Sequence, residues 1–141
     1  MNDGAFDGGK LTQSEKELRD FYKRLLNFSA KSTAVMGQFQ DLQEVNRHAG
    51  LGYDPNHLYS FVRWSNNEKL IILTNFSAEA SNTFELKIPS DIIAKWNLKD
   101  GTYPLHDQLY GKTAVQLVVA NGEGKASITI NPLESFIYQL D

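Results

Sequence analysis

The stretch AVQLVVANGEGKASITINPLESFIYQLD, residues 114–141, indicates the fold class of the chain. Three segments in it have the composition of strands: Ala114–Val119, Ala126–Ile130 and Ser135–Leu140. Asn121-Gly122 joins the first two, and this pair favours a tight hairpin turn because both residues tolerate positive φ. Asn131-Pro132 joins the last two. A turn is expected there as well, because proline cannot donate a hydrogen bond to a ladder.

Upstream of this stretch, strands are expected at short intervals, separated by turn residues. Four are predicted: Ala34–Phe39, 57–65 (HLYSFVRWS), 68–77 (EKLIILTNFS) and 82–89 (NTFELKIP). The third is apolar throughout its centre and is predicted to lie in the middle of a sheet. The fourth alternates, and its inward side chains are predicted to be Phe84, Leu86 and Ile88.

The connections between these strands carry glycine, proline, asparagine and aspartate. Segment 46–56, NRHAGLGYDPN, is predicted to be a loop. Ser90 is expected to cap one helical turn in SDIIAKWN. Turns are predicted at Asn66-Asn67, Asp100-Gly101, Pro104 and Gly111.

One segment near the N-terminus has a different period. In LTQSEKELRDFYKRLLNFSA, residues 11–30, apolar residues recur at the spacing of one helix face: Leu18, Phe21, Tyr22, Leu25 and Leu26. Thr12 and Glu15 fit a capping box at its start, and Ser14 with Glu17 is the competing pair. The sequence therefore predicts a mainly β fold: an antiparallel Greek-key β-sandwich preceded by one N-terminal amphipathic helix.

Composition excludes several classes of function. The 141 residues have a net charge of -3, which does not favour a nucleic-acid partner. No apolar run approaches the length of a membrane helix, so no membrane association is predicted. The chain has no cysteine, which excludes disulfides and thiol nucleophiles and leaves the compartment undetermined. The N-terminus has neither the basic nor the apolar region of a signal peptide.

No catalytic, cofactor-binding or metal-binding residue is predicted, and no cofactor is expected. His48, His57 and His106 are far apart and lack metal-ligand spacing. The pair His106-Asp107 is interpreted as part of a turn, because neighbours on an extended chain point in opposite directions. The sequence contains no Gly-x-Ser-x-Gly elbow, phosphate loop or dinucleotide fingerprint.

Aromatic residues are the remaining candidates for a binding site. Exposed rings stack on sugar faces, so four residues are predicted as candidates for carbohydrate binding: Trp64, Trp96, Tyr103 and Tyr110. The alternative is that both tryptophans pack in the core or against another domain, because large aromatic side chains usually serve burial.

Several segments, in this order, resemble a known family. They are the helix with the small residues and glycine after it (18–37, LRDFYKRLLNFSAKSTAVMG), LYSFVRWS (58–65), LIILTNFS (70–77), the HDQLYG turn (106–111) and NPLESFIYQL (131–140). Together they are similar to the C-terminal end of glycoside hydrolases of the α-amylase family. In that family, a (β/α)8 catalytic barrel is followed by a β-sandwich domain.

The resemblance covers about residues 10–141 and implies a division of the chain. Residues 1–30 would comprise a lead-in loop and the last helix of the barrel, and residues 31–141 would form the C-terminal β-sandwich domain. The resemblance implies no catalytic residue here: His106-Asp107 superficially matches an Asn-His-Asp motif, but Leu105 stands in place of the asparagine.

The implied function is a non-catalytic domain that stabilises the barrel of an enzyme acting on α-glucans such as starch or maltooligosaccharides. The barrel of the same parent chain would be its partner, and the resemblance is compatible with a secreted or periplasmic parent. This chain alone would not hydrolyse glycans. Two alternatives stay open: a carbohydrate-binding module that contacts α-glucan through surface aromatics, and a protein-interaction sandwich unrelated to glycosidases.

Overall fold

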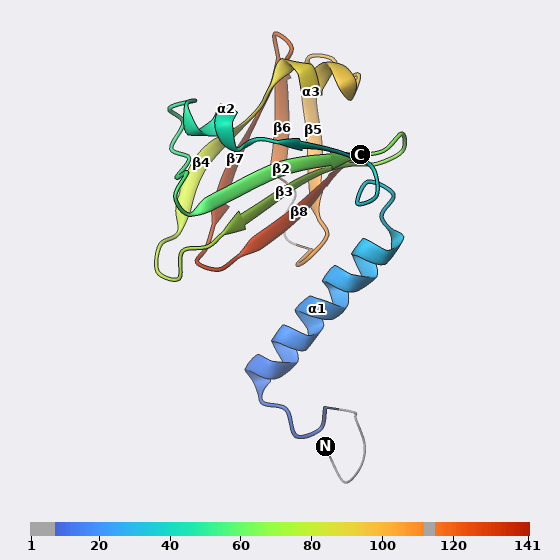
Figure 1. Ribbon diagram of the computed structural model, residues 1–141, viewed down its shortest axis with the longest axis vertical. Coiled ribbons are helices and arrows are strands. Elements are labelled where there is room, and N and C mark those ends of the chain that lie inside the picture. Colours follow the sequence, from blue (N-terminus) through green and yellow to red (C-terminus); the bar gives the residue numbers. More distant parts are fainter. Residues whose placement is uncertain (1–7, 112–114) are drawn as a thin grey trace. The chain divides into compact units, whose positions relative to one another are not determined.

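The computed structural model describes residues 8–111 and 115–141 (Figure 1). The chain divides into two compact units, Met1–Lys31 and Ser32–Asp141. Ala114, at the start of one predicted strand, lies outside the described residues, as do residues 1–7 of the predicted lead-in loop.

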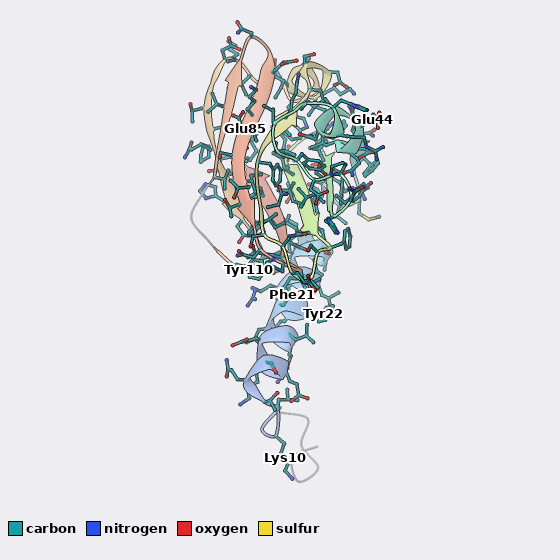
Figure 2. All side chains as sticks on the ribbon, turned by 90° about the vertical axis from the view of Figure 1, so that its left-hand side faces the viewer. Lys10, Phe21, Tyr22, Glu44, Glu85 and Tyr110 are labelled. Atoms are coloured by element: carbon teal, nitrogen blue, oxygen red, sulfur yellow. The ribbon has the colours of Figure 1, made fainter. Side chains whose placement is uncertain are left out.

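The first unit contains helix α1, Gln13–Lys31. Of the two possible capping boxes, the structure has the one at Thr12: Glu15 Oε2 accepts from the Thr12 amide at 2.8 Å, and Thr12 Oγ1 accepts from the Glu15 amide at 3.4 Å. The bonds that Glu15 Oε2 accepts from the Thr12 amide and, at 2.7 Å, from the Thr12 hydroxyl lower the pKa of the Glu15 carboxyl group. The predicted amphipathic helix is confirmed, and the exposed residues of its apolar side are Leu18, Tyr22 and Leu26. Tyr22 is labelled in Figure 2.

The second unit is built on one eight-stranded sheet, in which all pairs are antiparallel. Its strands are β1 (Gln38–Asp41), β2 (Leu58–Trp64), β3 (Lys69–Asn75), β4 (Asn82–Ile88), β5 (Gly101–Asp107), β6 (Val115–Ala120), β7 (Glu123–Ile130) and β8 (Ser135–Leu140). Their order in the sheet is β1-β2-β3-β8-β5-β6-β7-β4. Because β5, β6 and β7 follow one another and β8 returns to lie beside β5, the predicted antiparallel Greek key is confirmed.

The sheet curls on itself at β5. This strand pairs with β6 from Gly101 to Leu105 and with β8 from Leu105 to Asp107. The half-sheet β2–β3–β8 therefore crosses in front of β5, β6 and β7, as in a sandwich (Figure 1). The side chains buried in the resulting core include Val62, Ile71, Leu86, Leu105, Leu117 and Ile128.

The predicted strand patterns agree with the observed burial. In β4, Phe84, Leu86 and Ile88 are buried, whereas Thr83 is exposed. Strand β3 lies between β2 and β8, as its apolar composition predicted, and neighbouring side chains on both of its faces are buried.

The predicted hairpin at Asn121-Gly122 is confirmed. These residues have φ values of 52° and 74° and connect β6 to β7. The carboxylate of Asp100 accepts hydrogen bonds from both amides, at 3.0 and 3.2 Å. Asp100, the residue before β5, therefore links the β6–β7 turn to the start of β5.

The predicted turn at Asn131-Pro132 is confirmed, and after it β8 crosses over to lie between β3 and β5 rather than beside β7. The turn predicted at Pro104 is wrong. Pro104 lies within β5, opposite Gln116, rather than in a turn. Proline is tolerated there because β8 pairs with β5 only from Leu105 onward, so one side of β5 has no partner strand at Pro104.

Three local predictions also need correction. The first strand begins at Gln38 rather than Ala34, because residues 33–36 form a turn. The predicted loop 46–56 starts within a short helix, α2 (Gln43–Arg47). Ser90 is the first residue of helix α3 (Ser90–Lys95) and does not cap it, since the N-cap is Pro89 and no side-chain capping bond forms.

Segment 42–52 seals the outer edge of β4. The Glu85 amide donates to the Leu51 carbonyl at 3.0 Å. Two residues along the strand, the Lys87 amide donates to Asn46 Oδ1 at 2.8 Å, and Asn46 Nδ2 donates back to the Lys87 carbonyl at 3.0 Å. The buried amide of Asn46 thus takes the place of a neighbouring strand.

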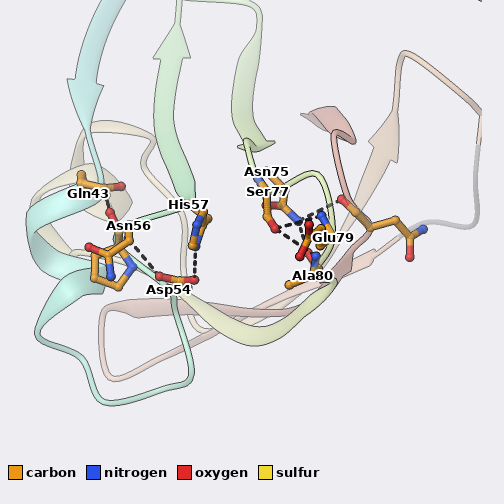
Figure 3. Close-up of polar contacts among 10 residues, drawn as sticks. Gln43, Asp54, Asn56, His57, Asn75, Ser77, Glu79 and Ala80 are labelled. Atoms are coloured by element: carbon orange, nitrogen blue, oxygen red, sulfur yellow. Dashed lines mark hydrogen bonds and ion pairs between the residues drawn. The ribbon is translucent and has the colours of Figure 1, made fainter.

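Short-range polar contacts hold the loops after α2 and after β3 (Figure 3). Asp54 accepts from the Asn56 amide at 3.0 Å and contacts His57 Nδ1 at 2.8 Å. The buried side chain of Asn75 accepts from the Ser77 amide and donates to the Ala80 carbonyl. Such contacts satisfy backbone groups that no strand pairs.

Candidate functional site

The structure separates the four aromatic residues predicted to bind carbohydrate. Trp96, at the end of α3, is only 3% exposed and belongs to the core, where burial leaves no ring face for a sugar. Its Nε1 is a buried donor without a partner among the described residues. Trp96 therefore serves packing, which is the alternative that the sequence left open.

The two tyrosines differ from Trp96 in their exposure and contacts. Tyr103, in β5, is half-buried, and its hydroxyl donates to the Lys99 carbonyl at 2.9 Å. Tyr110 follows β5 and is 37% exposed, and its ring meets that of Phe136 edge-on at 6.0 Å. Both side chains therefore have structural partners of their own.

Trp64 lies at the end of β2, beside three polar side chains. We call Gln40, Trp64, Asp91 and Lys95 the Trp64 cluster. Gln40 Nε2 donates to Asp91 Oδ2 at 2.9 Å, and Lys95 Nζ donates to Gln40 Oε1 at 2.9 Å. Lys95 Nζ also lies 3.0 Å from Asp91 Oδ2 and 5.8 Å from the centroid of the Trp64 ring. Strands β1 and β2 and helix α3 thus contribute to one site.

The electrostatics of the Trp64 cluster are balanced. The hydrogen bond from Gln40, followed by that from Lys95, lowers the pKa of the Asp91 carboxyl group, so Asp91 is ionised at neutral pH. Trp64 packs partly against the core, which fixes its ring. The side chains of Lys95 and Asp91 are 46% and 51% exposed, so both groups are open to a ligand.

Sequence reasoning identified Trp64 but missed its three neighbours. Asp91 and Lys95 have the i, i+4 spacing of a helical ion pair, and that spacing was the one available signal. Gln40 lies 51 residues from Asp91 in the chain. Only the fold brings its amide to α3.

A second aromatic surface lies on the outer face of the sheet. We call Phe39, Phe61 and Tyr59 the aromatic strip. The Phe39 and Phe61 rings are 5.5 Å apart, and those of Phe61 and Tyr59 are 5.6 Å apart. Phe39 is 52% exposed and Tyr59 is 37% exposed. Desolvation, and to a lesser extent Asp41, raises the pKa of Tyr59.

A shallow groove of about 1120 Å³ crosses the outer face of β4, β7 and β6. Val118 and Ala120 line it, as do Glu85 and Lys125, whose charged groups lie 3.8 Å apart on neighbouring strands. None of the described residues that line the groove is aromatic. It therefore lacks the flat ring on which a sugar would stack.

In the described part of the chain, the histidines and carboxylates form separate exposed pairs and no metal-ligand cluster. The three histidines contact separate carboxylates: His48 with Glu44, His57 with Asp54 and His106 with Asp141. Residues 8–111 and 115–141 contain no cluster of three potential metal ligands. The sequence predicted that the pair His106-Asp107 is part of a turn, but both residues lie at the end of β5, and the turn follows at 108–110, where the Asp107 carboxylate accepts from the Leu109 and Tyr110 amides.

None of the helices in the described part of the chain is both long and apolar enough to cross a membrane.

Comparison with solved structures identifies proteins that share this fold. A variant of AmyP in complex with maltotriose matches 94% of this chain with a TM-score of 0.61 and 19% identity. An α-amylase from Anoxybacillus matches 89% with a TM-score of 0.59 and 22% identity. The cyclomaltodextrin glucanotransferase CldA, which has a three-domain ABC distribution, matches 87% with a TM-score of 0.58 and 16% identity.

In each case the match covers 22% of the other chain, so this chain spans about a fifth of the length of these proteins. Neither a protein-family model nor a curated protein sequence matches it. At these identities the comparison establishes a shared fold. That fold is one part of larger enzymes.

Proposed function

We propose that this chain is the C-terminal accessory region of an α-amylase-like glycosidase and that it stabilises the catalytic barrel. Residues 1–30 would contribute the lead-in and the last barrel helix, and residues 31–141 the non-catalytic β-sandwich. The observation that carries the proposal is the fold likeness to a fifth of several enzymes named for α-glucan chemistry.

Exposed apolar surface supports the proposal. Each unit has such a surface: Leu18, Tyr22 and Leu26 on α1, and the aromatic strip on the sheet. Buried apolar area contributes about 25 cal/mol per Å². Covering these surfaces with barrel helices would therefore stabilise both partners, and such a role requires no catalytic group in this chain.

The decisive experiment has two stages. The coding sequence before residue 1 is read first, and we expect it to encode a (β/α)8 barrel in the same frame. The thermal midpoint of the complete enzyme is then measured with Phe39→Ser and Phe61→Ser together, and separately with Val118→Ser as the control in the groove. The strip variant is expected to lower the midpoint by several degrees, and the control to change it little.

Absence of an upstream barrel would refute the proposal, as would equal midpoints for the strip variant and the unaltered enzyme. The chain alone, incubated with maltoheptaose, is expected to release no new reducing ends. Hydrolysis by the chain alone would contradict a purely accessory role.

A further inference from the structure

The Trp64 cluster combines an anchored aromatic ring with polar groups that are already fixed in position. Gln40, Asp91 and Lys95 form a closed triangle in which each side chain contacts the other two at 2.9 or 3.0 Å. A ligand that meets this triangle does not have to order three independent side chains. Preorganisation of this kind lowers the entropic cost of binding.

The triangle keeps hydrogen-bonding capacity for a ligand. An amide group carries two N–H donors, an ammonium group three, and a carboxylate about four lone-pair sites. The contacts within the triangle use one N–H of Gln40 and two of Lys95. A further N–H on each of these side chains and further lone pairs on Asp91 therefore remain available.

These groups select the chemistry of the ligand. An anion would meet Asp91 and a cation would meet Lys95, so neither charge is favoured over the whole cluster. A hydroxyl group can donate to Asp91 and can accept from Lys95 or Gln40. The exposed part of Trp64 offers an apolar surface beside them.

We propose that the Trp64 cluster binds one pyranose unit of a neutral glycan, with its C–H face on the indole ring and its hydroxyl groups on Gln40, Asp91 and Lys95. The choice of α-linked glucan as that glycan rests on the proposed function. The Lys95 ammonium lies 5.8 Å from the ring centroid, so the sugar would lie on the part of the half-buried ring that Lys95 leaves exposed, with Lys95 kept in the triangle.

Fluorescence titration of the full 141-residue chain with maltoheptaose tests this inference. The chain has two tryptophans, and Trp96 is buried, so a change in emission on binding is expected to arise from Trp64. We expect a saturable change in the unaltered chain. Gln40→Ala and Lys95→Met are each expected to weaken binding about tenfold, as loss of a hydrogen bond in a charged network would.

Gln116→Ala, in the groove, is the matched control and is expected to leave binding unchanged. Trp64→Phe is expected to abolish the emission change, and far-UV circular dichroism checks that each variant is folded. If Trp64→Phe fails to fold, the two polar variants still decide the question, because both side chains lie at the surface.

Two results would overturn the inference: no saturable change with maltoheptaose, or binding that persists unchanged in both Gln40→Ala and Lys95→Met. Equal or tighter binding of cellohexaose would overturn the assignment to α-linked glucan. None of these results affects the barrel-stability experiment, so failure of the sugar site and failure of the accessory role are distinguishable.

Discussion

Replacement of Asn46 by alanine is expected to destabilise the second unit far more than its position on a short helix would suggest. Asn46 is 1% exposed, and its amide makes three hydrogen bonds. Nδ2 donates to the Leu42 and Lys87 carbonyls at 2.9 and 3.0 Å, and Oδ1 accepts from the Lys87 amide at 2.8 Å. The substitution removes all three bonds.

The size of the effect follows from those bonds. A typical hydrogen bond contributes about 0.5–1.5 kcal/mol, and a buried group left unpaired costs about 1–3 kcal/mol. The amide and the carbonyl of Lys87 both lose their partner, whereas the Leu42 carbonyl keeps its bond from the Asn46 backbone amide at 3.1 Å. We therefore expect Asn46→Ala to lower the free energy of unfolding by about 3 kcal/mol.

Urea unfolding followed by far-UV circular dichroism measures the loss. Asn46→Asp separates the loss of the hydrogen bonds from the loss of side-chain volume, because aspartate keeps the shape and one acceptor of asparagine. It places a carboxylate against two carbonyl groups, so we expect it to be at least as destabilising as Asn46→Ala at pH 7. Asn67→Ala, in the exposed β2–β3 turn, is the control and should change stability by less than about 0.5 kcal/mol. A loss below about 1 kcal/mol in both Asn46 variants would refute the edge-sealing argument.

Three further outcomes are expected. Gly122→Ala should lower the free energy of unfolding in urea by about 1 kcal/mol, because the φ of Gly122 is 74°. Gly124→Ala should lower it by about 1–3 kcal/mol, because a Cβ there would lie 3.0 Å from side-chain atoms of Ile93 and Leu117. A larger loss for Gly122→Ala than for Gly124→Ala would contradict these two explanations. Trp96→Ala should lower the free energy of unfolding by about 3–5 kcal/mol. Trp96→Phe should lower it less, because the N–H that it removes has no partner among the described residues. Equal losses in the two variants would show that this N–H is satisfied. Burial raises the pKa of Tyr53 to about 12, so its contribution to stability is present below the unfolded pKa of about 10 and is lost as pH rises from 10 to 12. Alkaline unfolding should therefore be less steep in Tyr53→Phe, and unchanged steepness would argue against the shift.

Local signals predicted the strands and the helix because short-range physics decides them. The alternation in 82–89 and the turn chemistry of Asn121-Gly122 depend on neighbouring residues alone, and the structure agrees with both. The pairing of β8 could not be predicted in this way. The turn at Asn131-Pro132 would also suit a hairpin, and only the competition among all strands places β8 between β3 and β5.

The candidate site shows the same division. Trp64 could be selected from the sequence because it is aromatic. The polar groups beside it could not, because Gln40 lies 51 residues before its partner Asp91 in the chain. Trp96 was indistinguishable from Trp64 by sequence, because both follow short apolar segments. What separates them is burial: α3 turns Trp96 into the core, whereas Trp64 ends its strand half-buried.

The central place of β8 has a consequence for biosynthesis. Strand β8 leaves the ribosome after β3 and β5, yet both of these strands need it as their second partner. Until β8 is made, the nascent chain carries two strands that each have one open ladder edge, and open edges are prone to mispairing. A premature stop just before Ser135 would therefore leave a chain that is recognised by chaperones or proteases rather than a slightly shorter folded domain.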